Sequence, residues 1–155
     1  LSKVVKAFNE NKVDIVYGNL QYVSKNNLNK VIRFWKSSIY SKGKFSKGWS
    51  PPHPGFFYKK TILNDTFGYN ESMKIAADIE FMYRLLEINR YKSYYISTPL
   101  VQMRSGGLSG GLSSKILLNL EIISFLKSSA SDFNLFKFIL NKLFFKGMQY
   151  FKSGI

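Results

Sequence analysis

The sequence predicts an α/β domain in which a mixed sheet is flanked by helices. Short segments rich in Val, Ile, Tyr and Phe alternate with longer segments whose apolar residues recur at helical spacing. The chain has 155 residues, enough to bury a core, and its hydrophobic fraction of 45% is too high for a disordered polypeptide. Strands interleaved with helices are typical of layered α/β folds.

The chain begins with the pattern of a surface helix followed by strands. Residues 2–11 alternate apolar and charged side chains in the manner of an amphipathic helix. Residues 13–18 are then expected to form a buried strand and residues 20–23 a second, shorter one. The order of helix and strand is the first support for the predicted fold class.

The next part of the chain is less regular. Apolar residues suggest a short helix near 31–35, and residues 41–48 form a polar loop rich in Gly and Lys. Pro51 and Pro52 fix an extended segment, because each proline disfavours the helical conformation of the residue before it. A strand is predicted at 55–58, with the start of a short helix at 59–63.

The second half of the chain contains the clearest helix. Residues 78–89 have a broad apolar face. Pro99 separates two expected strands, 94–97 and 100–104. The remaining predicted elements are a flexible loop at 105–111 and two helices at 113–127 and 133–151.

The composition excludes several kinds of site. The chain has no cysteine, so it forms neither disulfides nor thiolate metal sites, and with His53 as its single histidine a zinc site is not expected. Its N-terminal residues lack the apolar core of a signal peptide. No window holds the roughly eighteen uncharged apolar residues that a membrane-spanning helix requires.

The net charge of +14 has two explanations. An excess of lysine suits a phosphate-rich partner, either nucleic acid or an anionic membrane. It also suits a composition bias, because arginine, which base-edge recognition favours, occurs at few positions. The chain shows no helix-turn-helix, zinc-finger or RNP pattern, so we expect no specific nucleic-acid partner and rank attraction to a membrane surface above it.

Asp78 is the candidate catalytic residue. It opens the helix predicted for residues 78–89, where a carboxylate can cap free amides or act as a general base. A base must lie within hydrogen-bond reach of the substrate hydroxyl, and a helix N-terminus at a sheet edge can place it there. Glu80 points to another face of the helix, so we choose Asp78 of the two.

His53 and Trp49 are candidate substrate contacts. Pro52 and Pro54 limit the backbone freedom of His53, so that its imidazole can hold a diphosphate or an acceptor hydroxyl. A packed or capped histidine is the alternative. Trp49 can stack on the face of a sugar or belong to the core.

Arg104 begins a segment that has the composition of a mobile lid. The segment contains Gly106, Gly107 and Ser109, and such a loop can close over a charged donor while Arg104 faces phosphate oxygens. An ordinary mobile connection between elements has the same composition. The glycines alone do not decide between the two.

Six motifs, taken together, resemble one family. They are Asp14-Ile15-Val16-Tyr17-Gly18-Asn19, Pro51-Pro52-His53-Pro54, Phe67-Gly68-Tyr69-Asn70-Glu71, Ile75-Ala76-Ala77-Asp78, Arg84 and Gly106-Gly107-Leu108-Ser109. Their order resembles that in bacterial family 2 glycosyltransferases, the inverting enzymes of the GT-A fold, over roughly residues 1–127. The resemblance implies that Asp78 is the catalytic base. It also implies that His53 and the glycine loop lie near the acceptor and the donor phosphates, and Arg84, a further matching position, is expected to contact substrate.

The same resemblance implies a reaction. Family members transfer a sugar from a nucleotide-diphosphate sugar to a hydroxyl of a saccharide or lipid-linked saccharide, in the synthesis of cell-envelope polysaccharides. Their D-x-D carboxylates, which hold a divalent cation (Mg²⁺ or Mn²⁺), would fall shortly before Val13, and this chain has no D-x-D. We therefore expect residues 1–112 to be the acceptor-side part of a GT-A domain, inactive alone. Asn19 stands where the family often has an acidic residue, so no role is carried over to it.

Residues 113–155 are expected to form a terminal helical segment. Within 133–151, large apolar residues are interleaved with Lys137, Lys142 and Lys146, a composition typical of a helix that lies in a bilayer interface. The alternative is a helix that docks on its own protein or on a second copy. We expect a cytoplasmic protein, with this helix as a candidate contact with the inner face of the membrane. The alternative function is a non-catalytic, basic peripheral-membrane or interaction module derived from such an enzyme.

Overall fold

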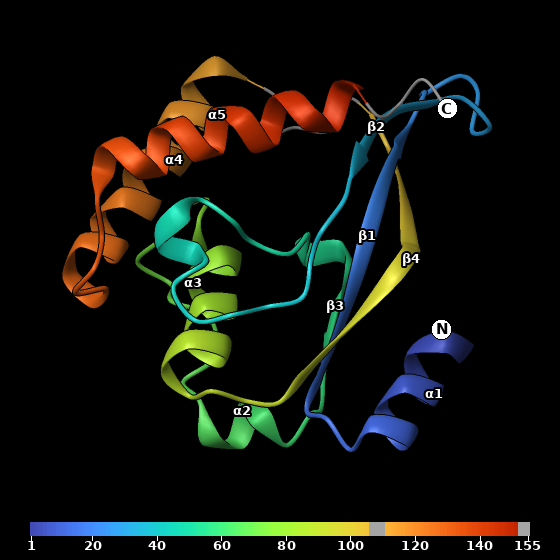
Figure 1. Ribbon diagram of the computed structural model, residues 1–155, viewed down its shortest axis with the longest axis horizontal. Coiled ribbons are helices and arrows are strands. Elements are labelled where there is room, and N and C mark those ends of the chain that lie inside the picture. Colours follow the sequence, from blue (N-terminus) through green and yellow to red (C-terminus); the bar gives the residue numbers. More distant parts are fainter. Residues whose placement is uncertain (106–110, 152–155) are drawn as a thin grey trace.

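The computed structural model describes residues 1–105 and 111–151, apart from the side chains of Leu112, Tyr150 and Phe151. It is a mixed α/β fold with a four-stranded mixed sheet flanked by helices, which confirms the predicted class (Figure 1). The strands are β1 (Ile15–Val23), β2 (Val31–Trp35), β3 (Phe56–Tyr58) and β4 (Ser93–Arg104). The helices are α1 (Ser2–Asn11), α2 (Ile62–Asp65), α3 (Ala77–Tyr83), α4 (Leu112–Ser129) and α5 (Leu135–Phe151), and shorter helical turns are η1 (Phe45–Lys47), η2 (His53–Gly55) and η3 (Arg84–Ile88).

Strand β1 is central because it pairs along both edges. β4 runs parallel to it along one edge, while β3 and β2 pair antiparallel with the first and last parts of the other edge. Successive side chains of β1 face opposite sides of the sheet. Val16 packs with α1 on one side, whereas Ile15 and Tyr17 belong to the main core on the other. Burial on both faces explains why this strand reads as a nearly continuous apolar run.

Strand β4 is bent by a bulge around Pro99. Gly18 of β1 pairs with Ile96 and the next residue, Asn19, pairs with Pro99, so β4 contains two extra residues at this point. The sequence predicted two strands separated by Pro99. The observed strand is continuous because the bulge accommodates the proline, which has no N–H for the ladder.

Asn19 compensates for the bulge and is completely buried. Its Nδ2 donates to the carbonyl of Ser97 at 2.6 Å, and its Oδ1 accepts from the N–H of Ser37 at 2.8 Å and from the Tyr95 hydroxyl at 2.7 Å. The side chain therefore satisfies the carbonyl of Ser97 in the bulge and joins β4 to the segment that follows β2 at Ser37. This is a structural role.

Three local predictions are corrected. Residues 31–35 form β2 and not a short helix, because their β-branched and aromatic side chains pair with the second half of β1. The strands predicted at 13–18 and 20–23 are one strand. The helix predicted for 78–89 continues beyond α3 as the π-helical turn η3.

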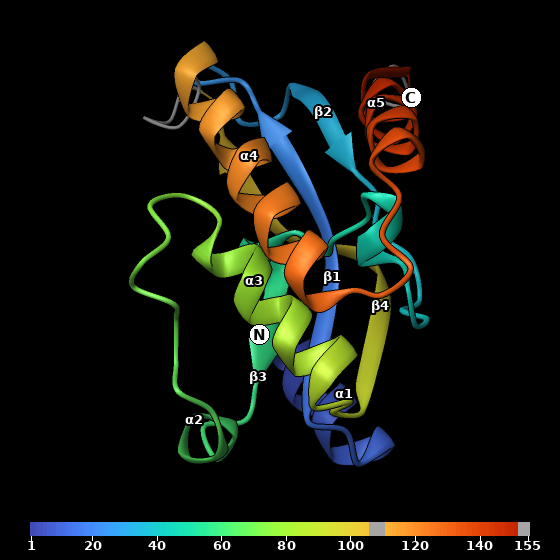
Figure 2. The ribbon, with the colours of Figure 1, turned by 90° about the vertical axis from the view of Figure 1, so that its left-hand side faces the viewer.

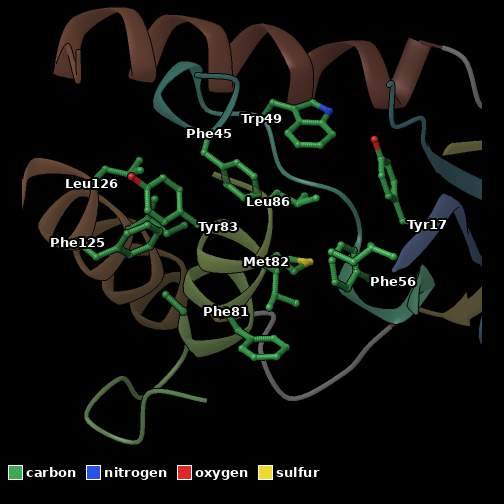
Figure 3. Packing of buried hydrophobic residues seen from close by; sticks show 14 of the residues in the cluster. Tyr17, Phe45, Trp49, Phe56, Phe81, Met82, Tyr83, Leu86, Phe125 and Leu126 are labelled. Atoms are coloured by element: carbon green, nitrogen blue, oxygen red, sulfur yellow. The ribbon is translucent and has the colours of Figure 1, made fainter. Parts of the chain in front are cut away.

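The main core lies between the sheet, α3 and α4 (Figure 3). Phe81 and Leu86 of the α3–η3 segment pack in the same buried cluster as Phe125 and Leu126 of α4 and Phe138 of α5. The terminal helices thus share one core with the preceding residues. Among the described residues, no helix is both long and apolar enough to cross a bilayer.

Candidate functional site

The side chains of His53 and Asp78 lie next to each other. Nδ1 of His53 is 3.9 Å from Oδ2 of Asp78, and both side chains are 37% exposed. This distance is too long for a hydrogen bond, and the contact becomes an ion pair when the imidazole is protonated. Both groups are therefore accessible to a molecule that approaches from solvent.

The proline segment places His53 at this point. Pro51 and Pro52 are buried, and the N–H of Gly55 donates to the carbonyl of Pro52 at 3.0 Å, which closes the turn η2. The extended conformation predicted for this segment holds for Pro52, whereas His53 begins the turn. Because η2 contacts both β1 and α3, the imidazole is held beside the first turn of α3.

Asp78 lies in that first turn. Its Oδ1 accepts a hydrogen bond from the N–H of Ile79 at 2.8 Å, while Oδ2 faces His53. One oxygen thus binds a free amide at the helix N-terminus, where the helix dipole stabilises negative charge. The other oxygen is free of backbone contacts and can accept a proton from a bound hydroxyl. Capping and general-base roles are compatible in this geometry.

Glu121 of α4 anchors the segment that enters α3. Its carboxylate accepts hydrogen bonds from the N–H groups of Lys74 at 2.9 Å, Ile75 at 3.0 Å and Ala76 at 2.8 Å. Desolvation raises the pKa of Glu121, but the three N–H donors together lower it more, so the pKa lies below its ordinary value. Sequence analysis gave no indication of this anchor, which depends on the packing of α4 against the α3 entry.

Tyr69 is the second partner of His53. Its hydroxyl is 3.1 Å from Nε2 of the imidazole, and its ring packs on Phe81 at a centroid distance of 4.6 Å. Burial, the Tyr58 hydroxyl and the charge of Asp78 raise the pKa of Tyr69 to about 12, so this hydroxyl keeps its proton at neutral pH. When it donates that proton to Nε2, a neutral His53 carries its own proton on Nδ1, the nitrogen that faces Asp78.

A surface hollow of about 480 Å³ lies beside this group. Tyr69 lines the hollow and contacts His53, so the two features share a residue. Phe67, also in the lining, is fully exposed. Sequence analysis singled out neither aromatic side chain as a site residue, although both belong to the motif at residues 67–71. Their position in a turn, where a core aromatic is not expected, was the available signal.

Arg84 lies in the wall of the same hollow, where it is paired. Its Nε donates to Glu80 Oε1 at 2.8 Å, its Nη2 donates to Glu80 Oε2 at 3.1 Å, and Nη2 also contacts the carbonyl of Gly68. These contacts tie the loop around Gly68 to α3. Glu80, the carboxylate not chosen as the base, also lines this hollow and is held there by its ion pair with Arg84.

Trp49 lies in the main core and is 8% exposed. Its ring packs edge-on against Phe45 at 5.4 Å and against Tyr17 at 6.2 Å (Figure 3). Of the two alternatives that the sequence left open for this residue, packing supports the core. A sugar ring would have to displace core side chains in order to stack on it.

The predicted donor-side residues lie elsewhere or outside the described residues. Arg104 is exposed at the end of β4, in register with Val23. Gly106, Gly107 and Ser109 fall in the segment that the structure does not describe. Within residues 1–105 and 111–151, no group of three or more His, Asp or Glu side chains could hold a metal ion. The residues present therefore do not fit a divalent cation.

Comparison of the chain with protein-family models, with curated proteins and with solved structures finds no match. The group comprises a carboxylate with one free oxygen, an imidazole with a defined partner on each side, and an open hollow with aromatic walls.

Proposed function

We propose that the chain is the acceptor-side part of an inverting glycosyltransferase, with Asp78 as its general base. The observation that carries the proposal is the pairing of Asp78 with His53 at an accessible surface beside the hollow. The order of the six motifs, which resembles that of family 2 glycosyltransferases, supports it. The substrates would be a nucleotide-diphosphate sugar and a saccharide or lipid-linked saccharide.

The reaction requires one proton transfer and one displacement. Oδ2 of Asp78 takes the proton of the acceptor hydroxyl, and the hydroxyl oxygen forms a bond to the anomeric carbon of the donor sugar. The bond from that carbon to the diphosphate breaks, and the nucleoside diphosphate leaves with the electron pair. Attack opposite to the leaving group inverts the configuration. His53, with its proton on Nδ1, orients the acceptor oxygen, and Tyr69 fixes this tautomer.

The hollow supplies a place for the acceptor. Phe67 and Tyr69 offer aromatic faces, and Asn70 and Glu71 add polar groups at the same wall. Sugars combine an apolar ring face with hydroxyl groups at its edge, so this lining suits them. The proposal assigns the contacts with the donor nucleotide and with any divalent cation to sequence beyond these 155 residues.

The proposal includes a cytoplasmic location, because nucleotide-diphosphate sugars are cytoplasmic donors. The acceptor would be presented at the inner face of the cell membrane, as in the synthesis of cell-envelope polysaccharides. The alternative, a non-catalytic basic module derived from such an enzyme, differs in one respect that can be measured. It would retain the fold but would not depend on Asp78.

Asp78→Asn tests the assignment of the base in the protein encoded by the whole reading frame. The amide retains the shape of the side chain and cannot take the proton, so turnover should fall about 10³-fold. Labelled sugar incorporated into acceptor is the quantity to measure. Asp65→Asn is the matched control, because Asp65 is an exposed carboxylate on α2 and its substitution should leave turnover unchanged. Equal rates in the two variants would exclude Asp78 as the base.

A further inference from the structure

We propose that the outer face of α5 binds the surface of an anionic lipid bilayer. This face carries large apolar side chains at helical spacing, and each of them is between 45% and 71% exposed. They are Phe136 (71%), Ile139 (45%), Leu140 (51%), Leu143 (64%) and Phe144 (62%). A contiguous exposed apolar patch of this kind marks an interaction site, whereas single exposed apolar residues do not.

The inner face of α5 is already attached to the protein. Phe138 is 2% exposed and belongs to the main core, and a Cβ added at Gly48 would lie 3.1 Å from its carbonyl oxygen. At the other end of the helix, Nε of Arg33 donates to Oε1 of Gln149 at 2.7 Å. α5 therefore has apolar residues on two sides. On the side away from the core, no other segment of the described residues packs over them. In both ribbon views the helix runs along the margin of the molecule (Figure 2).

The charges around the outer face identify the partner. Lys137 and Lys146 are exposed and lie on opposite flanks of the apolar residues, and the helix contains no Asp or Glu. Apolar residues bordered by lysines are the arrangement of helices that lie in the plane of a bilayer, with their apolar side in the acyl region and their lysines at anionic headgroups. The net charge of +14 adds long-range attraction to such a surface.

Two other arrangements fit less well. In a symmetric dimer the same patch of each copy forms the contact. Lys137 and Lys146 of one copy would then lie close to the same lysines of the other copy, and their charges would repel. Insertion across the bilayer requires a longer and more apolar helix than any in the part of the chain described. A helix parallel to the surface buries the outer face and leaves the core contacts of the inner face intact.

Flotation of the full chain with lipid vesicles tests this proposal. The chain should float with vesicles of phosphatidylcholine and phosphatidylglycerol and much less with phosphatidylcholine alone. Leu140→Glu/Leu143→Glu places charge on the outer face, away from the core, and should abolish flotation. Lys137→Gln/Lys146→Gln should weaken binding to anionic vesicles about 25-fold, because each lysine near the surface contributes a factor of about five.

Matched controls come from the opposite end of the molecule, where α1 and α2 lie (Figure 1). Val5→Glu/Leu63→Glu and Lys3→Gln/Lys60→Gln make the same changes at exposed positions, and both should float like the unmodified chain. Circular dichroism of each variant shows whether it folds.

Three results would overturn the proposal. The first is folded protein that does not float, and the second is equal loss of flotation in the α5 variants and their controls. The third is a dimer in sedimentation velocity that Leu140→Glu/Leu143→Glu converts to a monomer, without vesicle binding by the unmodified chain. This last outcome would assign the face to a second copy.

Discussion

At the scale of single residues, Gly18 shows how closely β1 and β4 approach at the bulge. A Cβ on Gly18 would lie 2.5 Å from Cγ and 2.6 Å from Cδ1 of Leu100, and 3.1 Å from the carbonyl oxygen of Ile96. These atoms belong to a branched side chain and to the backbone of β4. A side chain at position 18 therefore requires the bulged part of β4 to move.

Gly18→Ala should lower the free energy of unfolding by about 1–3 kcal/mol, the usual cost of overpacking. Urea denaturation of the purified chain measures the change. Gly147→Ala is the control: apart from the neighbouring residues and the backbone of α5 itself, no atom lies within 4 Å of a Cβ at this position, so the alanine should stabilise the chain by about 0.5–1 kcal/mol. Unchanged stability of Gly18→Ala would mean that Leu100 moves aside without cost.

The sequence indicates individual site residues better than their partners. The position of Asp78 at a helix start and the prolines around His53 were readable, because helix capping and proline geometry are local properties. The contact of His53 with Tyr69 was not readable, because it depends on how the loop at residues 66–76 folds back. The role of Trp49 is ambiguous in sequence for a different reason, because an aromatic side chain suits both a core and a sugar site.

At the scale of elements, α4 fixes the start of α3 through Glu121. The three N–H groups that Glu121 binds immediately precede α3, so the position of this carboxylate decides where the helix begins and where Asp78 lies. α3 has no side-chain N-cap of its own at Ala76. Glu121 supplies from a distant helix the acceptor that a capping residue supplies locally.

Glu121→Gln should destabilise the chain by about 1 kcal/mol at neutral pH, because the amide has one acceptor oxygen in place of two. The folded state lowers the pKa of Glu121, so the stabilisation is complete above the unfolded pKa of about 4.3. It is lost as pH falls through the lower folded value. Urea denaturation at a series of pH values measures this difference, which should shrink in acid. A difference independent of pH would show that the charge of Glu121 is not involved.

Local sequence patterns predict the strands less well than the helices, because a strand depends on the strands with which it pairs. Residues 31–35 are ambiguous in sequence because Val, Ile, Phe and Trp suit a strand or an apolar helix, and the pairing of β2 with β1 decides between them. β4 was divided at Pro99 because the bulge that admits the proline depends on Asn19, on another strand. The two long terminal helices agree with the predicted ranges, because long segments rich in Leu and Lys and free of proline favour a helix on local grounds.

At the scale of the whole molecule, the proposed activities belong to two surfaces. One is the hollow beside Tyr69 with the exposed pair His53 and Asp78, and the other is the outer face of α5. A shared core connects the elements that carry them. A protein that takes sugars from cytoplasmic donors and passes them to a lipid-linked acceptor would use both surfaces at one membrane.

Transfer of labelled sugar is the measurement that tests the proposed function most directly. The protein encoded by the whole reading frame, including any sequence upstream of Leu1, would be incubated with a panel of nucleotide-diphosphate sugars and envelope extract as acceptor. The 155-residue chain would be tested alone in parallel. We predict incorporation from at least one donor by the whole-frame protein and little or none by the chain alone. No incorporation from any donor by a folded whole-frame protein, or a stop codon directly upstream of Leu1, would contradict the proposed function.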